Sequence, residues 1–471
     1  MNADAVIVGG GVAGLACATA LADLGLRAVV LEEAERLGGR AASDVDPTTG
    51  DAIDIGPHVL TSEHRNFCGL LRRVGTARKV LWQPEPMLTL FDAGKRLPLH
   101  SWPLLPPLQG LPNLRQVLQC VGMADLASNW RVVWTAARLD EPELLRLDAI
   151  DALSFLKRLG VTQRFIDWYW TPVALSLLNV PLARCSTAAL MRLFRLMIGR
   201  SGYHFGFPKV GLSELFVPGC RRIVEAAGGT VATGCAVREL VLRDGRFEAA
   251  VLADGRRIAA RCAVLAVPPL ALAKLAPPAW RDADTLPATA ARRFEPCPYV
   301  STMLWFDRPL TRDRFWARVW RPGDLNLDFY DLSNIRDGAA GGPATIASNA
   351  IHAHDAWDWS DERIVDRTHA EIAEFAPAAA TARVRHAVVH RIPMAIACPL
   401  PGTETLRPSQ RTPFHNLWIA GDWTRTGLPS SMESAARSGA LAAEAVAAHF
   451  GRHRAIAKPP PDTKGLVALL S

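Results

Sequence analysis

The chain has 471 residues, of which 49% are hydrophobic and 21% are charged, and its net charge is +7. This composition is typical of a folded globular protein of two or three domains and excludes a disordered or collagen-like chain. The basic residues are scattered, which disfavours a nucleic-acid partner, and the nine widely spaced cysteines lack C-x-x-C pairs, which predicts reduced, mostly buried thiols.

The chain begins with a pattern that predicts strand, tight turn, helix and strand. A short apolar run over 5–8 is followed by Gly-Gly-Gly-Val-Ala-Gly at 9–14, helical apolar spacing at 15–24 and a second apolar run at 26–31. The whole stretch is apolar enough to resemble a signal peptide or anchor, but it lacks a basic n-region and contains three adjacent glycines. We therefore expect a protein that begins its fold in the cytoplasm, without a spanning helix.

The glycines have the G-x-G-x-x-G spacing of a dinucleotide site, directly after a strand and at the start of a helix. Bare backbone there lets a pyrophosphate approach the N–H groups at the positive end of the helix. Glu32 follows the second strand, where a carboxylate accepts hydrogen bonds from a ribose diol and disfavours a 2′-phosphate. The alternative is a glycine turn in an ordinary βαβ unit. The candidate contacts are Gly9, Gly11, Val12, Ala13, Gly14 and Glu32.

Beyond this unit the character of the chain alternates. Residues 76–214 are rich in Leu, Trp and Pro and mostly helical in pattern, and 271–404 mix strand-like runs with Pro-rich turns. Between them, apolar runs separated by Asp-Gly turns over 230–267 predict a small antiparallel sheet. A strand at 417–420 and an Ala-rich helix at 433–449 precede a Pro-rich end that we expect to be a flexible tail.

Three motifs far apart in the chain point to a flavin. They are Leu37-Gly38-Gly39-Arg40, Ala420-Gly421-Asp422-Trp423 and Ser431-Met432-Glu433. With them the chain resembles the flavin amine oxidase and phytoene desaturase superfamily, which implies FAD. The resemblance places Arg40 along the pyrophosphate, Val237 at the adenine, Asp422 at the ribityl phosphate and Met432 at a helix N-terminus facing the flavin pyrimidine ring. The remaining expected FAD contacts are Gly39, Gly56 and Gly421.

The resemblance also implies the architecture. We expect an α/β fold, in which a discontinuous Rossmann-type FAD-binding domain (1–75, 215–270 and 405–450) carries an inserted mixed α+β substrate domain (76–214 and 271–404), followed by a flexible tail at 451–471. A cofactor-free relative with the same fold is the alternative.

Details of the motifs separate the branches of the superfamily. Amine oxidases typically have an aromatic residue where this chain has Ser431, and a lysine near the flavin, whereas lysines are absent between Lys274 and Lys458. The chain is more similar to the squalene-associated branch, the hydroxysqualene dehydroxylases of hopanoid synthesis. The motifs that carry this likeness are Asp54-Ile55-Gly56-Pro57-His58, Leu178-Asn179-Val180-Pro181, Leu212-Ser213-Glu214-Leu215-Phe216 and Thr426-Gly427-Leu428-Pro429. It departs from that branch in Ile55-Gly56-Pro57, where Asn-Gly-Gln is usual, and in Ser434, where Gly is usual.

This likeness implies reductive dehydroxylation of hydroxysqualene to squalene by hydride transfer from reduced flavin. The alternative is carotenoid or phytoene-type desaturation, and less expected are amine oxidation and a non-catalytic isoprenoid-binding flavoprotein. Loss of a hydroxyl requires an acid. We expect His58 in this role, with Asp54 and Glu433 as alternatives.

The expected partners follow from the same reaction. They are a long-chain isoprenoid, an external electron donor such as NAD(P)H or a reductase, and the surface of the inner membrane. Residues 97–123 and Trp168-Tyr169-Trp170 are candidates for an apolar tunnel or ordinary helical core, and 98–114 with Arg115 could enter the membrane interface. We expect no metal site, because His352 and His354 lack partners at ligand spacing and read as surface residues.

Overall fold

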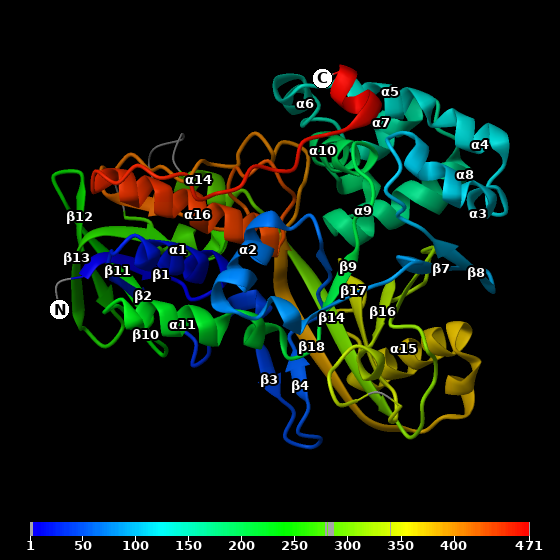
Figure 1. Ribbon diagram of the computed structural model, residues 1–471, viewed down its shortest axis with the longest axis horizontal. Helices are drawn as coiled ribbons and strands as arrows, with labels where there is room; N and C mark the ends of the chain where they lie inside the picture. The colour runs from blue at the N-terminus through cyan, green and yellow to red at the C-terminus, as the bar shows by residue number, and fades with distance from the viewer. Residues whose placement is uncertain (1–2, 278–279, 281–286, 340, 471) are drawn as a thin grey trace.

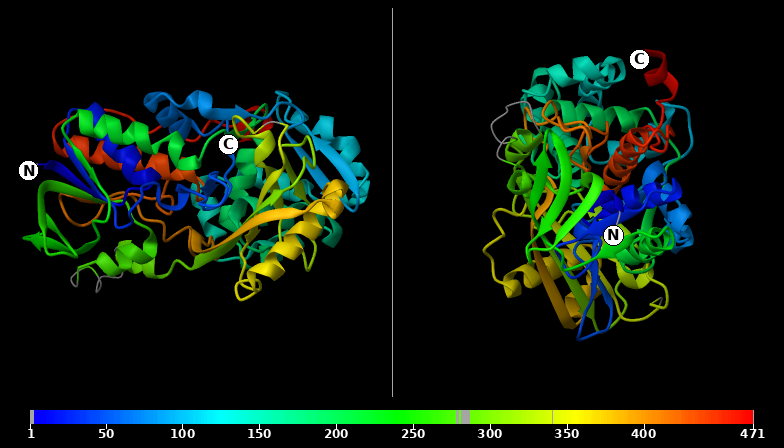
Figure 2. Two further views of the ribbon diagram at one scale, coloured as in Figure 1. Left: turned by 90° about the horizontal axis from the view of Figure 1, so that it is seen from below. Right: turned by 90° about the vertical axis from the view of Figure 1, so that its left-hand side faces the viewer.

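The computed structural model describes residues 3–277, 280, 287–339 and 341–470. Two sheets, each covered by helices, lie side by side, and a separate group of helices stands beside the second sheet (Figure 1). The molecule is elongated, with the N-terminal sheet at one end and the group of helices at the other (Figure 2).

The first sheet is doubly wound and confirms the Rossmann-type expectation. Its parallel strands run in the order β10 (Thr230–Ala232), β2 (Ala28–Leu31), β1 (Ala3–Val8), β13 (Arg257–Leu265) and β19 (Leu417–Ile419). One apolar core binds this sheet to α1 (Val12–Asp23), α2 (Arg65–Val74), α11 (Val217–Ala226) and α16 (Met432–His449). A second core lies under β11 (Val237–Arg243), β12 (Arg246–Leu252), α12 (Pro269–Leu275) and α14 (Pro287–Arg292).

The segment 230–267 differs from the single antiparallel sheet that its turns predict. The strands β11, β12 and the first half of β13 do pair antiparallel. However, β13 continues from Cys262 to Leu265 as a central parallel strand between β1 and β19, and β10 pairs in parallel with β2. Residues 262–265 are apolar on both faces and fully buried, which is typical of a strand covered on both sides.

The second sheet carries the substrate domain expected from residues 271–404. Its order is β18 (Val384–Ala397), β14 (Pro296–Phe306), β17 (Thr345–Ile351), β16 (Asp328–Asp331), β15 (Phe315–Arg318), β7 (Leu88–Asp92) and β8 (Lys95–Leu99). Helix α15 (Asp361–Phe375) packs on one face, where Phe375 stacks on Trp316 at a centroid distance of 4.4 Å. The opposite face packs against Ile53 and Phe207.

Within the inserted residues 76–214, residues 114–198 form the group of helices, while β7 and β8 join the second sheet. The helices are α3 (Leu114–Leu118), α4 (Met123–Ser128), α5 (Trp130–Arg138), α6 (Glu141–Arg146), α7 (Ala152–Arg158), α8 (Gln163–Phe165), α9 (Thr171–Leu178) and α10 (Thr187–Ile198). Buried Trp170 is central to their core, because its ring meets Phe194 at 4.7 Å and its Nε1 donates to Asn129 at 3.0 Å. Two small sheets connect this insertion to the rest: β5 (Leu60–Thr61), β9 (Phe205–Pro208) and β6 (Val80–Trp82), and β3 (Ser43–Val45) with β4 (Ala52–Asp54).

The C-terminal segment is packed, in contrast to the flexible tail that its composition predicts. The backbone carbonyl of Lys458 accepts from Arg437 at 2.7 Å, and that of Asp462 accepts from Arg200 at 2.8 Å. Helix α17 (Gly465–Leu470) then lies against α5, where Val467 is buried (Figure 1). The tail is ordered because long polar side chains of the folded domains bind its main chain, which composition does not reveal.

Candidate functional site

The glycine turn between β1 and α1 contains two kinds of glycine. A Cβ on Gly14 would lie 2.0 Å from the Gly9 carbonyl oxygen, and one on Gly9 would lie 2.5 Å from the Ala266 carbonyl oxygen, so both allow close packing of backbone. A Cβ on Gly11 would meet its nearest neighbours only at 3.9 Å. The space in front of Gly11 is therefore open, at the N-terminus of α1, where a pyrophosphate gains most from backbone N–H groups.

Glu32 follows β2 at the same edge of the sheet. Its carboxylate accepts from the N–H of Gly10 at 2.7 Å and of Ala34 at 3.0 Å. Its own carbonyl oxygen accepts from Cys235, two residues before Val237 at the start of β11. The structure thus brings Glu32 and Val237 near each other, as a ribose and adenine contact require.

Arg40 and Asp422 meet across 382 residues of sequence. The Arg40 guanidinium donates to Asp422 Oδ1 at 2.5 Å and Oδ2 at 3.3 Å, and to the Ala395 carbonyl at 3.0 Å. Asp422 itself is buried, while Arg40 keeps about a third of its side chain exposed (32%). The two motifs inferred to contact the flavin phosphate region therefore form one charged unit.

The N-terminus of α16 completes this edge. Ser431 is its N-cap and accepts from the Ser434 N–H at 3.2 Å, and Met432 opens the helix as a buried residue. The Ser434 hydroxyl donates to the Asp422 carbonyl at 2.9 Å, so the helix start and the Gly421-Asp422 turn are held together. A serine at 434 therefore has a structural use where the squalene-associated branch has glycine.

Helix α16 also crosses α1 at very short range, which the sequence motifs do not announce. A Cβ on Gly439 would lie 2.2 Å from the Ala13 carbonyl oxygen. Val12 and Ala13, expected as FAD contacts, are buried in the first turn of α1 beneath this crossing. Their side chains contribute to packing, and only their backbone faces the open space at Gly11.

Two of the three candidate acids have their carboxylates engaged in holding the fold. Asp54 accepts from Ser43 Oγ at 2.6 Å, from the Leu212 N–H at 2.8 Å and from Arg336 at 3.1 Å. Glu433 accepts from the N–H groups of Asn66 and Phe67, at 2.8 to 3.0 Å, at the start of α2, and burial raises its pKa. Asp54 nevertheless lines the same pocket as His58.

His58 is differently placed, in a pocket of about 230 Å³ that also includes Tyr330 and Phe207. Its Nδ1 lies 2.7 Å from the Gly56 carbonyl oxygen, so the neutral ring donates Nδ1–H there and leaves Nε2 as an acceptor. Burial lowers the pKa of His58, which favours this neutral form. The geometry therefore suits proton acceptance or orientation, rather than the proton donation expected from the sequence.

Several ionisable side chains lie deep in the protein but keep part of their surface exposed. They are enclosed by protein yet half-buried rather than fully packed: His58, His64, Tyr169, Tyr203, Tyr299 and Asp328. Burial lowers the pKa of His64 to about 4 and raises that of Asp328 to about 6. These side chains come from the segment between β4 and α2, from the second sheet, and from the group of helices and the loop after it.

Most of the large apolar side chains of residues 97–123, expected to line a tunnel or to form ordinary helical core, are exposed. Leu97 is buried, but Trp102, Leu105, Leu108 and Leu111 are 48 to 63% exposed on the outer surface. Tyr169 does line the interior, while Trp170 belongs to the helical core. An apolar, Pro-rich sequence reads alike for a tunnel and for an exposed patch, so only the tertiary structure separates them.

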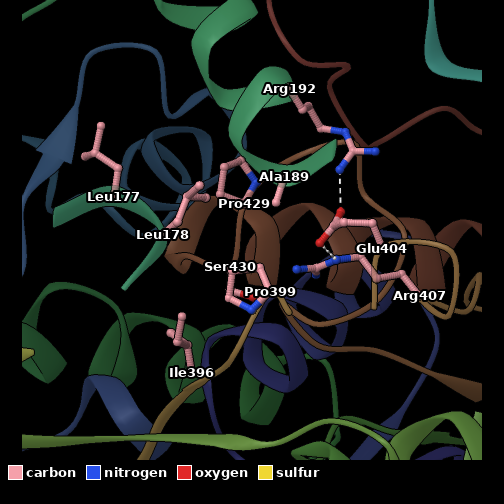
Figure 3. A pocket seen from close by; sticks show the side chains of 10 residues that line it. All are labelled: Leu177, Leu178, Ala189, Arg192, Ile396, Pro399, Glu404, Arg407, Pro429 and Ser430. Carbon is pink, nitrogen blue, oxygen red and sulfur yellow. Dashed lines mark hydrogen bonds and ion pairs between the residues drawn. The ribbon is translucent and has the colours of Figure 1, made fainter. Parts of the chain in front are cut away.

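A second pocket, of about 300 Å³, lies beside the N-terminus of α16 (Figure 3). Glu404 lies in it between two guanidinium groups, paired with Arg192 and with Arg407 Nε at 2.7 Å. Although burial opposes ionisation, Arg407 and Arg192 hold the pKa of Glu404 below its ordinary value. Arg407 also donates to the Asp422 carbonyl at 3.2 Å. Arg192 also pairs with Glu141 at 2.6 Å, so the cluster as a whole carries no net charge. Sequence reasoning missed it because its members lie on unrelated segments.

Histidine and acidic groups outside this region do not form a metal centre: among the described residues, no cluster of three His, Cys, Asp or Glu side chains is spaced to hold an ion. His354 is exposed and His352 is half-buried, where Arg184 approaches its Nε2 at 3.4 Å. All nine cysteines are free and buried, as their spacing predicts.

FAD fits the residues at this edge. The open space at Gly11, the Glu32 carboxylate, the exposed part of Arg40 and the positive N-terminus of α16 match its pyrophosphate, ribose and flavin ring. The individual contacts between these residues and FAD are predictions from the motifs.

The comparisons with known proteins agree with this cofactor. A family model described as flavin containing amine oxidoreductase matches residues 12–447. The chain is 26% identical to a 15-cis-phytoene desaturase of Synechococcus elongatus, covering 94% of this chain and 95% of that one. It is 29% identical to a carotenoid phi-ring synthase of Streptomyces griseus, covering 94% and 88%. A cyclohexylamine oxidase from Brevibacterium oxydans has the same fold, with a TM-score of 0.72 over 96% of this chain and 100% of that chain, at 18% identity.

Proposed function

Because the chain belongs to the family of flavin containing amine oxidoreductases and is an FAD-dependent oxidoreductase, we propose that it transfers hydride between FAD and a long-chain isoprenoid. The observation that carries this proposal is the likeness to carotenoid enzymes, which extends over 94% of the chain and therefore includes both large sheets. Tyr169, Tyr203 and Tyr299 lie deep in the protein and keep part of their surface exposed, which suits a site that keeps an apolar chain from water.

The first candidate reaction is desaturation of a carotenoid-type polyene, because the relatives named are desaturases and a carotenoid ring synthase. When bound, FAD supplies a hydride acceptor in its oxidised form and a hydride donor in its reduced form. The protein binds and orients the chain, excludes water, and takes up the proton that leaves with the second carbon–hydrogen bond. Neutral His58, with its free Nε2, is suited to accept that proton.

The second candidate is reductive dehydroxylation of hydroxysqualene, the reaction that the squalene-associated motifs favour. A specific structural observation supports it: Asp328 accepts a hydrogen bond from Tyr330, which lines the His58 pocket, and burial raises the pKa of this carboxyl group to about 6. A carboxyl group with a pKa of about 6 is protonated in a larger fraction than an ordinary aspartate and can donate that proton to a leaving hydroxyl, which a pure hydrocarbon lacks. This reaction also needs an external electron donor, for which NAD(P)H or a reductase are the candidates.

Amine oxidation is disfavoured for this chain, although amine oxidases share its fold. Ser431 occupies the position of the aromatic residue expected before Met432, and its hydroxyl caps α16. An isoprenoid-binding flavoprotein without catalysis would bind the polyene and leave the flavin redox state unchanged.

A membrane surface is the proposed source of so insoluble a substrate. The exposed apolar side chains of residues 102–134 lie on the group of helices, and exposed Leu466 and Leu469 of α17 lie beside α5 (Figure 1). Within the described part of the chain, helices that are long and apolar enough to cross a bilayer are absent. We propose that this face enters the interface of the inner membrane from the cytoplasmic side.

The deciding experiment uses the FAD-loaded protein under anaerobic conditions. Oxidised protein is mixed with phytoene or its C30 analogue, and photoreduced protein with hydroxysqualene, and the products are identified by mass spectrometry. A longer chromophore with reduced flavin supports desaturation, and squalene with one equivalent of oxidised flavin supports dehydroxylation. Binding without a change in either flavin state would leave only the non-catalytic alternative.

A further inference from the structure

A row of polar side chains crosses the second sheet on the face turned toward the first domain. Ser301 of β14 pairs with Asn349 of β17 on one side and with His390 of β18 on the other. On β16, Phe329 pairs with Ser348, so Asp328 comes opposite Asn349 in the same register. Side chains alternate across a strand, and the four therefore share one face.

This face is apolar on either side of the row. The next positions along the strands are Met303, Ala347 and Tyr330, which pack in one cluster with Phe207 and Ile53. The position beyond Ser301 in the other direction is Tyr299, which packs against the group of helices. Four polar residues aligned across such a surface are unusual for a wall that contacts only hydrocarbon.

The row lies beneath the loop that carries His58. Asn349 Nδ2 donates to the Pro57 carbonyl at 3.4 Å. A Cβ on Gly56 would lie 3.2 Å from Asn349 Oδ1 and 3.7 Å from Ser301 Oγ. Glycine at 56 therefore lets the loop that carries His58 approach the row closely.

Two acceptor oxygens of the row lack a hydrogen-bond donor among the described residues: Asp328 Oδ1 and Asn349 Oδ1. Asn349 is only 6% exposed, and the other Asp328 oxygen accepts from the Tyr330 hydroxyl at 2.6 Å. A buried polar atom left without a partner costs about 1–3 kcal/mol. Both oxygens are thus poised for a donor that a ligand brings.

We propose that Asp328 and Asn349 form a hydroxyl-binding site in the substrate cavity, in which an alcohol group of the isoprenoid donates to one of the two free oxygens. The proposal rests on the proposed function, because it assumes that the cavity holds a long-chain isoprenoid. A hydroxyl is the group that fits: it has a donor for an acceptor and an oxygen that can accept from a protonated carboxyl. A hydrocarbon leaves both oxygens unpaired, so the site selects for the alcohol.

The test compares two ligands that differ only in the hydroxyl, hydroxysqualene and squalene, on the FAD-loaded protein in detergent micelles. Binding is measured by the change in flavin absorbance and by tryptophan fluorescence. For the unaltered protein we expect the alcohol to bind about 10- to 100-fold more tightly than the hydrocarbon, the usual effect of one or two buried hydrogen bonds.

In Asn349→Leu the new side chain has nearly the same shape as asparagine. This variant should reduce the preference at least tenfold, mainly because it binds the alcohol more weakly. The matched control is Thr302→Val, an isosteric change on the same strand but on the α15 face, where the buried Oγ1 also lacks a partner among the described residues. The control should keep the full preference. If Asn349→Leu loses FAD or fails to fold, Asp328→Leu, which keeps a similar shape but removes both carboxylate oxygens, serves in its place with the same expected direction.

The outcomes separate the two proposals. Equal affinity of the unaltered protein for both ligands, or a preference that survives in Asn349→Leu, overturns the hydroxyl site while the isoprenoid cavity stands. Binding of neither ligand overturns the proposed function itself, and the hydroxyl site with it.

Discussion

Gly11→Val should abolish FAD binding without unfolding the protein. Gly11 has φ −78° and ψ −173°, an extended conformation that valine adopts readily, and the nearest atoms to a Cβ there are 3.9 Å away. The free energy of unfolding of the FAD-free protein should therefore change by less than about 0.5 kcal/mol. The branched side chain instead fills the space that the pyrophosphate needs.

The expected loss of affinity follows from the hydrogen bonds given up. Two or three charge-assisted bonds from the turn, at about 1.5–3 kcal/mol each, correspond to about 10²–10⁶-fold weaker FAD binding. FAD content after gel filtration, the flavin absorbance spectrum and urea unfolding of the FAD-free protein measure both quantities.

Gly14→Ala serves as the contrasting variant, because its Cβ would lie 2.0 Å from the Gly9 carbonyl oxygen. It should destabilise the protein by about 3 kcal/mol even without FAD. Full FAD occupancy in Gly11→Val would refute the assignment of the open space to the pyrophosphate, and unfolding of FAD-free Gly11→Val would refute the geometry of the turn.

Three further predictions concern other parts of the molecule. Glu433→Ala removes the acceptor of the first N–H groups of α2 and should lower the free energy of unfolding, measured by urea titration, by about 3 kcal/mol. The control Glu225→Ala breaks the exposed ion pair with Arg221 and should change this free energy by less than about 0.5 kcal/mol. Equal effects of the two changes would contradict the capping role of Glu433. Burial raises the pKa of Asp328 from 3.8 to about 6, so its neutral form favours the folded state and the stability from this group falls as pH rises through that interval. Between pH 5 and pH 8, the free energy of unfolding of Asp328→Asn should therefore rise by about 1–2 kcal/mol relative to that of the unaltered protein. Parallel pH profiles of the two proteins would contradict the raised pKa. The triple change Trp102→Ser, Leu105→Ser and Leu108→Ser should weaken binding to phosphatidylglycerol vesicles in a flotation assay about 100-fold, because each half-exposed side chain contributes about 1 kcal/mol. The control Leu270→Ser on α12, where the side chain is 39% exposed, should float as the unaltered protein does. Unchanged flotation of the triple variant would rule out this face as the membrane contact.

Local patterns explain why the cofactor domain could be predicted from the sequence. The strand, glycine turn and helix of residues 3–23 need only neighbouring residues to specify them, and the spacing of Gly9, Gly11 and Gly14 is a direct consequence of a tight turn. The strand at 417–419 and the helix from Met432 were equally readable. The flavin was predicted because the short motifs around Arg40, Asp422 and Met432 resemble those of a known flavoprotein superfamily.

Tertiary structure alone determined what lines the cavity. Asp328 and Asn349 are adjacent only because β16 and β17 pair in one register, and an isolated Asp or Asn gives no sign of that. The same holds for the triad of Arg192, Glu404 and Arg407.

Burial likewise could not be obtained from composition. The apolar stretch around Trp102 faces solvent, and the Pro-rich tail is held in place by side chains such as Arg200 and Arg437. Cys262–Leu265 reads as part of an antiparallel meander but becomes a central parallel strand, because its partners lie some 250 residues before it and 150 after it. The sequence by itself therefore determined the elements and the cofactor, whose signals are local, while the fold decided burial, pairing and the walls of the substrate cavity, since each of these depends on contacts between distant segments.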